Sequence, residues 1–111
     1  MFNMQKMMQQ AQQVQFKLQE LQEKFKDIYV EGEAGGGLVK VTMSCSGVIK
    51  SIDIDPSIVD PSDKETLEDM VTAAINNASD VKETTVQTET QAMMQSMGLP
   101  ADAAKGGLPG F

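Results

Sequence analysis

The sequence predicts an α+β fold in which a long N-terminal helix, a three-stranded antiparallel sheet and a long C-terminal helix follow one another. Three patterns support this order. Apolar residues recur every three or four positions at the start, alternate with polar residues around residue 40, and recur at helical spacing after an Asp-Pro pair. A chain of 111 residues has the length of one domain. We expect a single domain over residues 1–97 and a flexible tail rich in Gly and Pro at residues 98–111.

The first helix is predicted from apolar residues that follow the alternating steps of a coiled-coil heptad. A stripe this narrow favours a facing helix as its partner. The opposite side of the helix is mostly Gln, Lys and Glu and should meet solvent. Phe16 lies nearly opposite the stripe, where it is either a stray exposed aromatic or part of a second contact. We predict that the stripe forms the dimer or packing surface, and its residues are Met4, Met7, Ala11, Val14, Leu18, Leu21 and Phe25.

The middle of the chain changes to a period of two, which is typical of strands. One side of the central strand is apolar and the other polar, so one face should pack while the other meets solvent or a ligand. We expect flanking strands near residues 28–34 and 48–54, with Ile52 and Ile54 turned inward. The apolar positions of the central strand are Val39, Val41, Met43 and Cys45.

Three consecutive glycines, Gly35 to Gly37, separate the first two strand patterns. A phosphate-binding loop places its glycines after a strand and directly before a helix, and a P-loop adds a Lys-Ser or Lys-Thr pair. Here the glycines lie between two strands and no such pair follows. We therefore predict that they provide the positive φ angles of a hairpin connection.

The second helix is predicted to begin at Asp60 and Pro61. Asp60 can cap free backbone amides, and Pro61 fits the first helical position. The apolar pattern weakens further along, so we expect a more exposed extension to about Met97. The apolar face comprises first Leu67, Met70, Val71, Ala74, Ile75, Ala78 and Val81, and then, more weakly, Thr85, Thr88, Ala92 and Met93.

Residue types that carry catalysis are scarce. His is absent, and the single Cys45 alternates with residues that look buried. Four aspartates between residues 53 and 63 lack the Gly and the distal Glu of a calcium loop, so we interpret them as caps and turns. We expect no enzymatic activity, no cofactor, no metal site and no small-molecule substrate. The sequence shows no secretory signal and no membrane span, so we expect a cytoplasmic protein without membrane association.

Several motifs occur in a characteristic order: EGEAGGGLVKVTMSCSG, IDIDPSIVDPSDKETLEDMVTAAINNA, MGLP and GGLPGF. Together they closely resemble the YbaB/EbfC family of bacterial nucleoid-associated proteins over nearly the whole chain. The resemblance implies a homodimer whose long helices project from a sheet platform like tweezers. It also implies contact with double-stranded DNA with little sequence preference, a change in DNA shape, and a place in the nucleoid.

The charge distribution limits where such DNA contact could occur. The net charge is −7, but residues 1–50 carry +1 and residues 51–111 carry −8. We therefore expect the phosphate backbone to meet the first helix and the sheet face, while the acidic second helix faces away. Relatives resembling this chain also place basic residues after the AAINNA-like segment, where only Lys82 stands here. The candidate DNA-binding residues are Lys6, Lys17, Lys24, Lys26, Gln9, Gln10, Gln12, Gln13 and Lys82.

Two other interpretations stay open. The lysines could be the ordinary solvated flank of a coiled coil. A chain with long helices, a Met-rich apolar surface and an acidic exterior could instead be a protein-interaction adaptor or a prefoldin-like holder of unfolded chains, with no role on DNA. The candidate contact residues of such an adaptor are Met4, Met7, Met8, Met93, Met94 and Met97.

Overall fold

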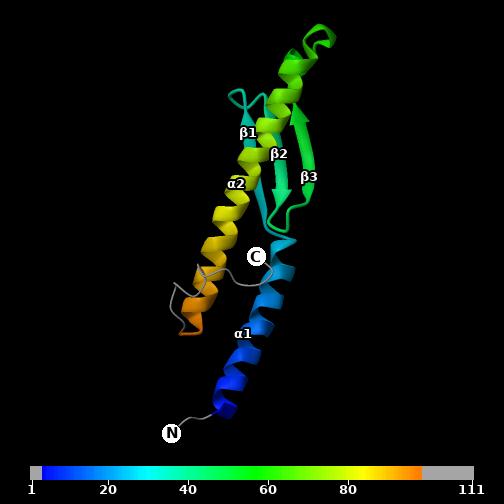
Figure 1. Cartoon of the computed structure of the whole chain (residues 1–111). Helices are drawn as coiled ribbons and strands as arrows, with labels where there is room; N and C mark the ends of the chain where they lie inside the picture. The colour runs from blue at the N-terminus through cyan, green and yellow to red at the C-terminus, as the bar shows by residue number, and fades with distance from the viewer. Residues whose placement is uncertain (1–3, 99–111) are drawn as a thin grey trace. The chain divides into compact units, whose positions relative to one another are not determined.

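A computed structural model describes residues 4–98 of the chain. Its elements confirm the predicted α+β order: one helix, a three-stranded antiparallel sheet, then a second long helix (Figure 1). None of the helices within the described range is long and apolar enough to cross a membrane. The elements are α1 (Met4–Phe25), β1 (Tyr29–Ala34), β2 (Val39–Ser44), β3 (Ile49–Ile54), two short 3₁₀ helices (Pro56–Ile58 and Pro61–Asp63) and α2 (Lys64–Ser96).

The chain divides into two compact units. The sheet unit comprises Phe25–Val86, and so holds the three strands and the first part of α2. The helical unit comprises Met1–Lys24 and Gln87–Phe111, of which residues 4–24 and 87–98 are described. Apart from Gly98, the tail predicted at 98–111 lies outside the described residues.

The strands pair as expected from the sequence. The order is β1-β2-β3, both pairs are antiparallel, and Val41 of β2 lies opposite Gly32 of β1 and Ile52 of β3. The predicted inward residues of β2 are buried, and Val39 and Val41 are fully so. Gly35, Gly36 and Gly37 all have positive φ, which confirms them as turn residues.

The first part of α2 lies along one face of the sheet, which we call the inner face (Figure 1). Contact is closest at Gly32, where an added Cβ would overlap backbone atoms of Ala78 and would lie 2.5 Å from the carbonyl oxygen of Ala74. Both alanines are completely buried, and the amide of Asn77 donates a hydrogen bond of 2.8 Å to the carbonyl of Glu33. Small residues on both elements therefore let helix and strand backbones approach directly.

β3 is an edge strand whose inner face is only partly covered. Ile52 was expected to point inward and pairs with the buried Val41, yet 42% of its surface is exposed. Ile49, also on β3, is 40% exposed. The reason is that α2 lies close to β1 at Gly32, so β3 falls beyond the cover of the helix. Period and pairing thus predict the face of a residue correctly without predicting how much of it is covered.

The aspartates after β3 act as caps. Oδ1 of Asp55 accepts a hydrogen bond of 2.8 Å from the amide of Ser57, and Oδ1 of Asp60 accepts one of 2.9 Å from the amide of Ser62. Pro61 opens a 3₁₀ helix, and α2 itself begins at Lys64, slightly later than predicted. Within residues 4–98, no group of three His, Cys, Asp or Glu side chains could hold a metal ion.

The second part of the apolar face of α2 differs from the prediction. In the helical unit, Thr90 and Met94 are buried, whereas the expected Thr88 and Ala92 are exposed. Val81, predicted for the first part of the face, is also 43% exposed. The 33 residues of α2 belong to two separate compact units. The buried residues of its first part and of its second part therefore do not lie along one continuous helical face.

Candidate nucleic-acid interface

The lysines of α1 lie on one side of a regular helix. Because 3.6 residues complete a turn, positions separated by 4, 7, 11 and 18 residues share a face. Lys6, Gln10, Gln13, Lys17 and Lys24 have this spacing within the 22 residues of α1, and we call them the lysine row. The first acidic residue of the chain is Glu20, so Lys6 and Gln10 have no acidic neighbour within a turn along the sequence.

Two members of the row form ion pairs. Nζ of Lys17 lies 3.5 Å from Oε2 of Glu20, one turn further along α1, and Nζ of Lys24 lies 3.5 Å from Oε2 of Glu89 on α2. An acid of the second helix therefore lies beside Lys24, one of the candidate DNA-binding residues. Lys17, Glu20 and Lys24 are more than half exposed, and Glu89 is 36% exposed, so both pairs are open to solvent and weak and can exchange with other anions.

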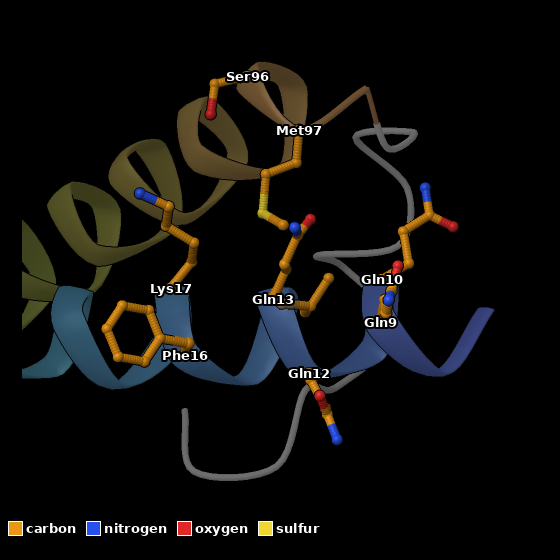
Figure 2. Close-up of a pocket in the computed structure, with 9 residues that line it drawn as sticks. Gln9, Gln10, Gln12, Gln13, Phe16, Lys17, Ser96 and Met97 are labelled. Carbon is orange, nitrogen blue, oxygen red and sulfur yellow. The ribbon is translucent and has the colours of Figure 1, made fainter. Parts of the chain in front are cut away.

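A hollow of about 900 Å³ lies between α1 and the end of α2 within the helical unit (Figure 2). It brings together five predicted site residues, namely Gln9, Gln10, Gln12, Gln13 and Lys17. In Figure 2 the side chain of Gln13 extends toward Met97, whereas the ring of Phe16 lies on the near side of α1. The remaining lining residues are Val14, Phe16, Ser96 and Met97.

The chemistry of the hollow is that of amides. Glutamine side chains can donate to phosphate or base acceptors and can accept from base donors, and Lys17 adds one positive charge. Among the described residues that line it there is no carboxylate, imidazole or thiol, so the hollow holds no general acid and base pair. The arrangement suits hydrogen bonding to a polyanion.

The other predicted lysines lie elsewhere. Lys26 follows α1 in the turn before β1, and both Lys26 and Lys82 belong to the sheet unit. Nζ of Lys82 would lie 3.8 Å from a Cβ added to Gly47 at the β2–β3 connection. These two residues therefore do not belong to the lysine row. The same unit contains a cation–π contact that no sequence pattern predicted, with Nζ of Lys50 lying 4.5 Å from the ring centre of Tyr29. The register of β2 and β3 shifts between Thr42 and Met43, opposite Lys50, and no period in the sequence marks this irregularity.

The predicted packing stripe of α1 is buried at only one end. Met4 is 70% exposed and Met7 55%, Val14 and Leu18 are half-buried, and Leu21 and Phe25 are buried. Burial therefore increases steadily from the beginning of α1 to its end. The exposed methionines leave a surface that another chain could cover.

Comparison with known proteins agrees with these features. A model of the YbaB/EbfC DNA-binding family matches residues 1–97. A nucleoid-associated protein of Bordetella avium is 49% identical over 94 residues, covering 85% of this chain and 86% of the relative. Another nucleoid-associated protein, from Streptomyces avermitilis, is 43% identical over 109 residues, covering 98% and 91% of the two chains. The crystal structure of an uncharacterized protein from Helicobacter pylori has the same fold, with a TM-score of 0.72, 22% identity, and coverage of 85% of this chain and 99% of that one.

Proposed function

Since the chain belongs to the YbaB/EbfC DNA-binding family, we propose that it is a nucleoid protein that binds duplex DNA through its phosphate backbone. The contact surface is the lysine row of α1 together with the neighbouring glutamines. Phosphate contacts fix the position of a protein on DNA without reading its sequence, so binding depends little on sequence. The observation that carries the proposal is the exposed face of α1 on which Lys6, Lys17 and Lys24 lie in line with two glutamines.

The protein acts as a homodimer in this proposal. A three-stranded sheet with an uncovered apolar edge strand favours a second copy as its cover, and the exposed Ile49 and Ile52 are the residues to be buried. Two copies double the number of lysines that one duplex can meet. If a dimer neutralises about four phosphates, log K should fall with log salt with a slope near −3.6. Such binding is weak and is lost at moderate salt.

Fluorescence anisotropy with plain duplex DNA at a series of low salt concentrations tests the proposal. The double variant Lys17→Glu/Lys24→Glu should abolish most binding and flatten the salt dependence, because both copies lose two phosphate contacts. Lys40→Glu/Lys64→Glu is the matched control, since it makes the same change in net charge at two exposed lysines of the sheet unit. Equal losses in the control and the double variant would point to net charge alone, and unchanged binding in the double variant would remove α1 from the mechanism.

The exposed methionines favour a second candidate function, the protein-interaction adaptor. Met4, Met7 and Met8 at the start of α1 are all more than half exposed, as an apolar docking surface requires. Met94 is buried and is not available for that role. An adaptor should capture a protein partner with little dependence on salt and should ignore duplex DNA at low salt, whereas the nucleoid role predicts the reverse.

A further inference from the structure

Phe16 is a large aromatic residue exposed in the middle of α1. Its side chain lies opposite the apolar stripe, and 61% of its surface is accessible. Figure 2 shows the ring on the near side of the helix, beside Lys17, and the ring is one of the groups that line the hollow. Neither the packing of the helical unit nor phosphate contact by the lysine row accounts for an aromatic ring at this place.

The surroundings of Phe16 on α1 are polar, with glutamines before the ring and the carboxylates of Glu20 and Glu23 on the same helical face after it. The residues one turn before it are Gln12 and Gln13, and those one turn after it are Gln19 and Glu20, so no apolar neighbour extends the ring into a hydrophobic patch. Protein interfaces centre on clusters of buried apolar side chains, which this site does not offer. A single aromatic ring that follows a run of amides and lies next to a lysine matches a different partner, the stacked bases of nucleic acid.

We infer that Phe16 is a wedge that inserts between base steps of bound DNA and bends it, an inference that rests on the proposed function. Apolar side chains inserted from the minor groove unstack one step and kink the duplex toward the major groove. The amide of Gln12, one turn before Phe16, can then bond acceptors of base edges, while Lys17 neutralises a phosphate beside the opened step.

The dimensions of DNA agree with a wedge and not with passive insertion of the helix. A helix with its side chains is about 10–12 Å across, whereas the minor groove is about 6 Å wide. α1 therefore reaches base edges from this side only if the groove opens, and kinking by an inserted side chain opens it. The minor groove distinguishes bases poorly, which fits binding with little sequence preference.

The test compares Phe16→Gln with Phe16→Leu on a duplex of about 30 base pairs that carries a fluorescence donor and acceptor at its ends. At saturating protein and low salt, the wild type should bring the ends together. Phe16→Gln should bind within about three-fold of wild type, because the cost of unstacking disappears together with the inserted side chain, but should lose most of the change in energy transfer. Phe16→Leu should keep most of it, since leucine is also an effective wedge.

Three controls make the result decisive. Val59→Gln removes an equally exposed apolar residue from the sheet unit and should change nothing. Lys17→Gln should lower affinity and reduce the salt slope, whereas Phe16→Gln should leave that slope unchanged. Circular dichroism and sedimentation should show Phe16→Gln folded and with the mass of the wild type, because the replaced ring is exposed.

The outcomes separate the two proposals. Wild-type protein that fails to bind DNA at low salt overturns the proposed function, and the wedge with it. Wild-type protein that binds without bringing the ends together overturns the wedge alone. The wedge is equally overturned if Phe16→Gln bends DNA as well as the wild type does, or if this variant dissociates into smaller species, since Phe16 would then be an interface residue.

Discussion

The two compact units differ in how tightly they are packed. In the sheet unit, Val39 and Val41 are fully buried, and Gly32 lets the backbone of α2 approach that of β1 directly. In the helical unit, burial is concentrated at Leu21 and Met94, while the first part of α1 is exposed and rich in glutamine.

This contrast suggests a division of work within one small chain. Close packing in the sheet unit provides the free energy of folding, because buried apolar area is the main favourable term. The helical unit contributes less to the free energy of folding, so its surface can be polar and can expose apolar side chains for binding. Substitutions in the sheet unit should therefore change stability, and those on α1 should change binding.

The largest expected effect is that of Gly32→Ala. A methyl group at this position overlaps backbone atoms of Ala78, which cannot move aside as a flexible side chain can. We expect a loss of about 3 kcal/mol or more in the free energy of unfolding, measured by urea denaturation. Gly36→Ala is the control, because nothing lies near its added methyl group and only its positive φ is strained, at a cost of about 1–2 kcal/mol. Equal losses would mean that α2 does not pack closely on β1.

The next effect sharpens the contrast within the helical unit. Met94→Ala removes a side chain that is only 1% exposed and should cost about 2–4 kcal/mol, seen as faster hydrogen exchange in α1 and the end of α2. Met4→Ala replaces an exposed side chain of the same type and should change stability by less than about 0.5 kcal/mol. A comparable loss at Met4 would show that a second copy covers the whole predicted stripe.

Much of this architecture follows from the sequence because local signals are strong. The heptad steps of α1, the alternation of β2 and the three glycines each have a direct conformational cause, and each prediction is confirmed. The caps at Asp55 and Asp60 follow from short-range chemistry in the same way. Such features depend on neighbours within a few residues, which the sequence displays.

Features that depend on distant parts of the chain were harder to predict. Gly32 occupies an inward strand position and Ala74 and Ala78 are one turn apart, but only their pairing in space shows that the small residues meet. The exposure of Ile52 depends on where the helix crosses the sheet. At the candidate site, residue type suggested Gln10, Gln13 and Lys17, whereas the ion pair between Lys24 and Glu89 joins residues 65 positions apart and left no local signal.

A smaller effect concerns acid stability in the sheet unit. Hydrogen bonds from the side chain and then the backbone amide of Ser62 lower the pKa of Asp60 from its ordinary value of 3.8. A group with a lowered folded pKa stabilises the fold above its unfolded pKa, and this contribution is lost as the pH falls through the folded value. Asp60→Asn should keep the cap while flattening the loss of stability below about pH 4, whereas Asp60→Ala should lower the urea midpoint at every pH. Identical pH profiles for Asp60→Asn and the wild type would contradict this role.

The smallest effect should be a gain in DNA binding from Glu89→Gln. Glu89 pairs with Lys24 of the lysine row, so its carboxylate competes with phosphate for the same ammonium group. An exposed pair of this kind is worth about 0.5 kcal/mol, which corresponds to about a two-fold rise in affinity at low salt. Glu68→Gln makes the same change in net charge but releases Lys64 in the sheet unit. If both variants bind DNA more tightly by the same factor, net charge alone controls binding. If only Glu89→Gln binds more tightly, and this gain disappears as salt screens the charges, Lys24 lies at the DNA.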